Sequence, residues 1–163
     1  VSALPFFLNK NRAVGGKNIK GSPYVVDAIN RLISEGIAVE YFYVTDVNSK
    51  NMRFYQAQAD IVVEQLRYGW WGSTGIETMG LGRPVICYLR KSAKQSFLKI
   101  YPEYKSLPII EANVNNIYDV LKKTVTDKAY REKKGKESRK FAESFFDVSK
   151  NVIGLEKTLL EIK

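Results

Sequence analysis

Short apolar runs alternate along the chain with stretches in which apolar residues recur at helical spacing. Runs of about four to eight apolar residues bounded by glycine, proline or polar residues are typical of buried β-strands. The strand-like runs are ALPFFL (3–8), IAVEYFYV (37–44), DIVVEQL (60–66), PVICYL (84–89) and LPIIEA (107–112).

Helices are predicted between these runs. The first has Ser22 as its N-cap, Pro23 at its first helical position and Gly36 just after its end, an order typical of helices. The pattern also predicts helices over 48–58 and about 73–81, a polar and aromatic connection over 90–106, and helices from 114 onward, broken near 126 and 146, the last over 148–162.

Strands that alternate with helices predict an α/β protein, with a doubly wound parallel sheet of about five or six strands and helices on both faces. The length fits a single domain over 1–163, with the C-terminal helices, about 127–163, packing on it. Ligands bind such sheets at the carboxyl ends of the strands. Glycine-bearing loops follow the first and third predicted strands, so we expect them to line a ligand crevice.

The composition narrows the chemistry. The chain has no histidine and a single cysteine, Cys87, which is read as a small buried strand residue. A single cysteine excludes an internal disulfide. The lack of histidine nearly excludes catalytic triads that use histidine as well as zinc sites, and no metal site is expected. No apolar run approaches the ~20 residues of a membrane helix, and the lone cysteine favours a reducing, cytoplasmic setting. The opening VSALPFF, without an initiator Met, suggests a piece of a longer protein.

The net charge of +9 is concentrated in two clusters. Positions 121–141 carry nine Lys or Arg against three acids, on a stretch that is predicted to be helical. That cluster is read as a solvated helix face, which also fits attraction to anionic lipid headgroups or RNA. Positions 9–20 carry four Lys or Arg and no acid, in a glycine-bearing loop where phosphate is the expected partner.

The segment GSTGIE lies where a helix is predicted to begin. Backbone N–H groups at a helix start favour an anion such as phosphate, and Gly72, Ser73, Thr74 and Gly75 allow its close approach. Glu77 has two readings. It forms a capping box with Thr74, or it accepts hydrogen bonds from the paired hydroxyls of a ribose.

The basic loop has two readings as well. Arg12, Lys17 and Lys20 converge on a diphosphate from the opposite wall of the crevice, or they are solvated surface. The adjacent Trp70 and Trp71 either stack on a base or sugar ring or pack into the domain.

The segments IKGSPYVVDAI, ADIVVEQLRYGWWG and GIETMGLGRPVICY together resemble the C-terminal, donor-binding domain of a two-domain Rossmann-type (B-fold) glycosyltransferase. The closest resemblance is to the retaining family four of bacterial sugar transferases. It implies that Glu77 holds the donor ribose, that the amides of 72–75 face the donor phosphates, and that Arg12 and Lys20 neutralise the departing diphosphate. Lys17 has no clear counterpart, and Gly69 stands where the family usually has another acid.

The resemblance further implies a nucleoside-diphosphate sugar as donor, UDP- or GDP-sugar above all, with no cofactor and no metal. The acceptor would be a saccharide or a lipid-linked sugar, held by an N-terminal domain that this chain lacks. The chain alone would then bind donor without turnover, in the cytoplasm, with peripheral contact to the inner membrane face.

Two other functions fit parts of the pattern. A sugar-nucleotide epimerase shares the fold. A nucleic-acid-binding module would explain the charge, but it needs aromatic residues interleaved with Lys and Arg. Here the aromatic residues lie mainly in the predicted strands and the glycine segment, so no nucleic acid is expected as partner.

Overall fold

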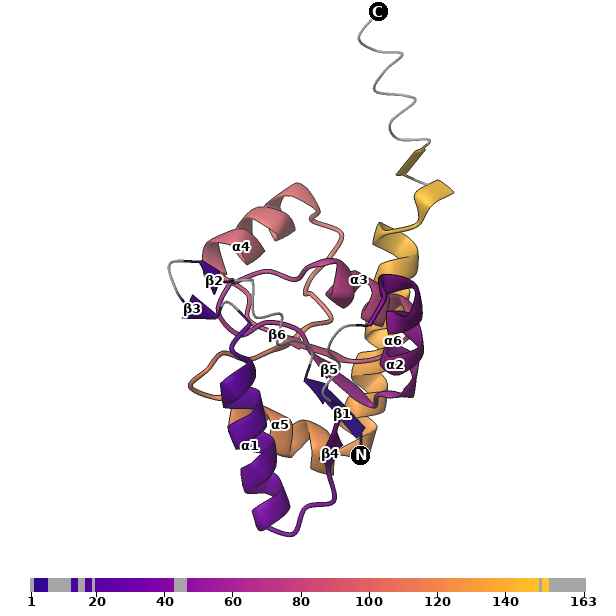
Figure 1. The fold of residues 1–163 in the computed structure, drawn as a ribbon. Coiled ribbons are helices and arrows are strands. Elements are labelled where there is room, and N and C mark those ends of the chain that lie inside the picture. The colour runs from indigo at the N-terminus through magenta and orange to yellow at the C-terminus, as the bar shows by residue number, and fades with distance from the viewer. Residues whose placement is uncertain are drawn as a thin grey trace, which may run out of the picture.

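The sheet at the centre of the molecule has five short parallel strands in the order β4-β1-β5-β6-β7 (Figure 1). The computed structural model describes residues 2–5, 13–14, 17–18, 20–42, 47–149 and 151–152. The strands of the sheet are β1 (Ser2–Pro5), β4 (Glu40–Tyr41), β5 (Ile61–Val63), β6 (Val85–Cys87) and β7 (Ile110–Glu111). A separate antiparallel pair, β2 (Ala13–Val14) and β3 (Lys17–Asn18), lies in the basic loop.

Six helices accompany the strands in the described residues. They are α1 (Ser22–Ser34), α2 (Ser49–Gln58), α3 (Ser73–Gly80), α4 (Lys91–Ile100), α5 (Ile117–Thr126) and α6 (Lys128–Phe145). The α/β class that the sequence predicts is therefore confirmed. No helix in the described ranges combines the length and apolar character that crossing a bilayer requires.

Both faces of the sheet are covered by helices. Successive side chains of a strand point to opposite faces. In β6, Ile86 belongs to a core formed with α1 and α5, whereas Val85 and Cys87 belong to a core formed with α3, α4 and α6. All three residues are fully buried. A strand buried on both sides explains the uninterrupted apolar run in this part of the sequence.

The second core is aromatic. The Phe97 ring of α4 lies 5.2 Å from that of Phe145 and 6.2 Å from that of Phe141, both on α6. Trp70 and Trp71 stack on each other at 4.1 Å, and Trp71 meets Phe141 edge-on at 6.2 Å. Both tryptophans therefore pack into the domain, and Trp71 is nearly buried.

The segment 90–106 was predicted as a connection, and this prediction is wrong over its first part, which forms α4. Phe97 is the only buried residue of this helix, and lysines occupy several of its other positions. One buried anchor does not produce the repeating apolar spacing from which a helix is recognised in a sequence.

Helix boundaries agree closely with the prediction elsewhere. Helix α1 begins at Ser22, but the N-cap is Gly21, with a left-handed φ of 74°, one residue earlier than predicted. The break near 126 is confirmed, because Asp127 caps α6 by accepting the amide N–H of Tyr130 at 2.8 Å. Of the helix predicted over 148–162, residues 148–149 and 151–152 are helical, and the remainder lies outside the described residues.

Candidate functional site

A pocket of about 300 Å³ lies at the carboxyl end of β5. It brings together Lys20, which follows the basic loop, and the first residues of α3, which follow β5. These are the two segments that the sequence places at this edge of the sheet. The pocket is lined by Lys20, Glu64, Gln65, Tyr68, Trp71, Gly72, Ser73 and Thr74.

A buried ion pair occupies this pocket. The Nζ of Lys20 donates a hydrogen bond of 2.7 Å to Oε1 of Glu64, and the two side chains are only 6% and 1% exposed. Charged side chains are almost never buried to this degree unless they are paired. Lys20 therefore points inward to the pocket and is not part of a solvated basic surface.

The main chain holds this ion pair in place. The amide of Glu64 donates to the carbonyl of Ile86 at 2.8 Å, which continues the ladder between β5 and β6 by one residue. The amide of Leu66 donates to the carbonyl of Lys20 at 3.0 Å, so the basic loop ends against the segment that follows β5. Both members of the pair are thus anchored to the end of one strand.

The start of α3 forms another wall of the pocket. The amide of Gly72, the N-cap, donates to Oε2 of Glu64 at 3.2 Å. Ser73 and Thr74 line the pocket and lie in the first turn of α3. The backbone amides of a helix's first turn have no hydrogen-bond partner within the helix. Gly75 does not line it. A Cβ there would lie 3.0 Å from the Cβ of Trp71, so this glycine lets the helix approach the tryptophan.

Glu77 lies outside this pocket, on the exposed surface of α3. The capping box with Thr74 is wrong, because the helix begins at Ser73 and its N-cap is Gly72, which has no side chain to cap the helix amides. Instead, Oε2 of Glu77 accepts a hydrogen bond of 3.1 Å from Nε2 of Gln56. Gln56 belongs to α2 and is fully buried, so it fixes one oxygen of an otherwise exposed carboxylate.

Other predicted residues are placed only in part. Arg12 lies outside the described residues, and of Lys17 only the backbone, in β3, is described. Gly69 has a left-handed φ of 98°, and a Cβ there would lie 2.9 Å from that of Arg90. The left-handed backbone at this position therefore favours glycine over any residue with a Cβ, including an acid.

Sequence reasoning missed the acid of the pocket, Glu64, and the partner of Glu77, Gln56. The signal for Glu64 was present, since a charged residue directly follows the apolar run IVV of a buried strand. No comparable signal marks Gln56. Its burial comes from the packing of α2 against α3 and β1.

Cys87 is a free thiol buried in β6, as the sequence predicts. Burial raises the pKa of the thiol far above its usual range, and the neighbouring Glu64 carboxylate, 3.7 Å from Sγ, adds to this effect. The thiol therefore stays protonated at neutral pH, as is typical of a structural cysteine buried in a strand. Within the described ranges, no three Asp, Glu or Cys side chains gather as metal ligands.

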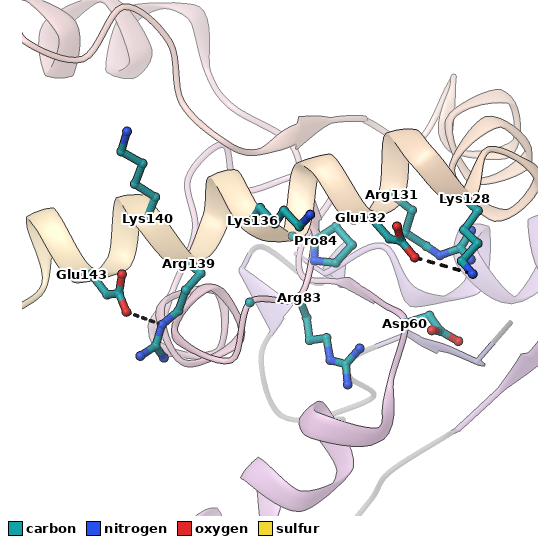
Figure 2. A pocket seen from close by; sticks show the side chains of 12 residues that line it. Asp60, Arg83, Pro84, Lys128, Arg131, Glu132, Lys136, Arg139, Lys140 and Glu143 are labelled. Atoms are coloured by element: carbon teal, nitrogen blue, oxygen red, sulfur yellow. Dashed lines mark hydrogen bonds and ion pairs between the residues drawn. The ribbon is translucent and has the colours of Figure 1, made fainter.

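A second hollow, a groove of about 540 Å³, lies between α6 and the turn from α3 to β6 (Figure 2). Six Lys or Arg side chains and three carboxylates line it. Several of these cations hold the fold together. Arg131 donates to the carbonyls of Thr124 and Val125, each at 2.9 Å, and Arg83 donates to that of Ala57 at 2.6 Å.

Two lysines of the groove face outward. Lys136 and Lys140 are exposed on α6, and Figure 2 shows the side chain of Lys140 extending away from Arg83. Lys128 lies 3.7 Å from Glu132, and Arg139 lies 2.7 Å from Glu143, each pair one helical turn apart. The basic run of the sequence is thus divided between structural contacts, surface ion pairs and an outward-facing set of lysines.

No protein-family model matches this chain, and comparison with curated proteins finds no match either.

Proposed function

We propose that the chain is the donor-binding half of a sugar transferase, a Rossmann-like unit with a doubly wound sheet that binds a nucleoside-diphosphate sugar. The observation that carries the proposal is the pocket at the carboxyl end of β5, in which a buried ammonium and the start of α3 face the same space. Ligands of parallel α/β sheets bind at this edge, and both features favour an anion.

The proposed chemistry is stabilisation of a leaving group. When a glycosidic bond to a nucleoside diphosphate breaks, negative charge grows on the diphosphate. Lys20 and the first-turn amides of α3, at Ser73 and Thr74, would offset that charge without a metal ion. Removing one such preorganised donor typically slows an enzyme by about 10²–10³-fold. Arg12 and Lys17 add positive charge from the same loop in this proposal.

Glu77 is assigned to the ribose of the donor. Its carboxylate is exposed, and one oxygen is held by Gln56. A carboxylate accepts several hydrogen bonds, so a held carboxylate can receive both hydroxyls of a ribose in a defined orientation. Glu77 does not serve as a cap of its own helix, because the N-cap is Gly72.

In this proposal the transferred sugar passes to a saccharide or lipid-linked acceptor, held by the N-terminal acceptor domain that the resemblance implies. We also propose a cytoplasmic location, with the outward lysines of α6 in contact with anionic lipid headgroups. Each Lys or Arg near such a surface contributes about 1 kcal/mol of attraction. Lys136 and Lys140 are both exposed on α6, and Figure 2 shows the side chain of Lys140 extending away from the helix.

The proposal is tested by titration calorimetry with UDP, GDP, ADP and CMP, each with and without magnesium. We expect metal-independent binding of one diphosphate, UDP or GDP, and loss of at least about tenfold in affinity for Glu77→Ala. The matched control is Glu103→Ala, an exposed glutamate that does not line the pocket. Absence of binding to all four nucleotides, or equal affinity for Glu77→Ala and its control, would contradict the proposal.

A further inference from the structure

We propose that Glu64 is the positioning residue of this pocket, which holds Lys20 and, through the amide of Gly72, the start of α3 where they meet the diphosphate of the donor. The inference rests on the proposed function and deepens it. It assigns a role to a buried carboxylate that neither the sequence motifs nor the resemblance singles out.

Glu64 joins three parts of the chain through its two carboxylate oxygens and its backbone amide. Oε1 accepts from Nζ of Lys20 at 2.7 Å, across 44 positions of the sequence, and Oε2 accepts from the amide of Gly72 at 3.2 Å, across eight. Its own amide is bonded to β6 through the carbonyl of Ile86. A single side chain at the end of a strand thus sets the position of the Lys20 ammonium and of the start of α3.

Positioning matters because a lysine side chain has several rotatable bonds. Ordering a free ammonium on binding costs conformational entropy, and that cost falls when a neighbour already holds the ammonium in place. The ammonium carries three N–H donors, so contact with Glu64 is compatible with contact to a phosphate oxygen. The start of α3 gains in the same way, because Oε2 holds the single N–H of Gly72 and so fixes the first turn, whose amides at Ser73 and Thr74 would meet the anion.

A carboxylate beside an anion site also repels the anion. Direct electrostatics alone predict that neutralising Glu64 strengthens diphosphate binding, whereas positioning predicts that it weakens binding. The two effects have opposite signs, so the direction of the change distinguishes them. Glu64 is also the only carboxylate among the residues that line this pocket, so no other acid there confuses the outcome.

The experiment measures the affinity of the 163-residue chain for UDP, GDP and inorganic pyrophosphate by titration calorimetry, below the unfolding temperature of every variant. The variants are Glu64→Gln, Lys20→Met and the double variant Glu64→Gln/Lys20→Met. We expect each single change to weaken binding at least tenfold, and the double variant to bind no more weakly than Lys20→Met alone. That non-additivity is the mark of Glu64 acting through Lys20.

Glu64→Asp serves as a second variant, since it keeps the charge but withdraws the carboxylate by one methylene. Positioning predicts a loss of at least threefold, whereas a role of the charge alone predicts no change. Unchanged or tighter binding by Glu64→Gln or Glu64→Asp, while the unsubstituted chain binds, overturns the inference and leaves the proposed function intact. If the unsubstituted chain binds none of UDP, GDP, ADP and CMP, both fail together.

Discussion

Lys20 and Glu64, 44 positions apart in the sequence, meet inside the molecule with Nζ 2.7 Å from Oε1. This contact joins the end of the basic loop to the carboxyl end of β5. It also means that the cation expected to meet a phosphate is already held by an acid in the unliganded chain.

The ion pair has a consequence for stability. Removing one partner of a buried pair leaves the other charge in the interior, which typically costs 3–5 kcal/mol. We expect Lys20→Met to lose about that much, and Lys20→Met/Glu64→Leu to recover most of it, to within roughly 1–2 kcal/mol of the unsubstituted chain. Urea unfolding with constant m-values measures both. A double variant as unstable as the single one would show that the pair contributes through more than its charges.

Gln56 supports Glu77 but is not itself well satisfied, because its buried Oε1 has no hydrogen-bond partner among the residues that the structure describes. Replacement by Met keeps the volume and removes this polar group. We expect the stability of Gln56→Met to change by less than about 1 kcal/mol, whereas the affinity for the bound nucleotide falls about five- to tenfold. Calorimetry and thermal unfolding separate the two effects. If Gln56→Met lowered the free energy of nucleotide binding and the free energy of unfolding by the same amount, a specific link to Glu77 would be contradicted.

Helix α6 packs tightly on the turn after α3 at Gly135. A Cβ added there would lie 2.4 Å from the backbone carbonyl oxygen of Gly82. Backbone cannot yield as a flexible side chain does, so we expect Gly135→Ala to destabilise the protein by about 1–3 kcal/mol. Gly80→Ala is the control, since a Cβ there meets nothing within 4 Å, and it should be neutral or stabilising by up to about 1 kcal/mol. Thermal unfolding of both compares them directly.

Glu35 links α1 to α5. Lys122 and Tyr118 donate hydrogen bonds to its carboxylate and lower its pKa from 4.5 to about 2. A folded-state pKa below the unfolded value means that this stabilisation is full above about pH 4.5 and is lost as pH falls towards 2. The stability difference between the unsubstituted chain and Glu35→Gln should therefore shrink on acidification. The site is exposed, so added salt should shrink it at neutral pH as well.

The outward lysines of α6 predict binding to anionic vesicles. We expect Lys136→Glu/Lys140→Glu to reduce co-sedimentation with phosphatidylglycerol vesicles by at least about tenfold in partition coefficient. The control, Lys91→Glu/Lys99→Glu, makes the same change of net charge on exposed positions of α4. Binding that is insensitive to lipid charge, or equally reduced in both variants, would remove the membrane from the proposal.

The sequence by itself determined the α/β class, most helix starts and the two segments that meet at the pocket. These features depend on local rules, namely apolar periodicity, cap residues such as Asp127, and glycine at turns. Helix α4 was not predicted, because its single buried residue, Phe97, gives no repeating apolar spacing in the sequence. The assignment of Arg12 and Lys17 stays a prediction, since their side chains lie outside the described residues.

Only the tertiary structure decided what Lys20, Glu64 and Glu77 contact. The sequence alone left open whether Lys20 is solvated and whether Glu77 caps its own helix. The packing of α2 against α3 places Gln56 beside Glu77, and the pairing of β5 with β6 fixes Glu64 opposite Lys20 and Gly72. Gln56 and Glu77 are 21 positions apart in the sequence, and Lys20 and Glu64 are 44 positions apart. Contacts over such separations depend on how the helices and strands pack, and no local sequence pattern encodes them.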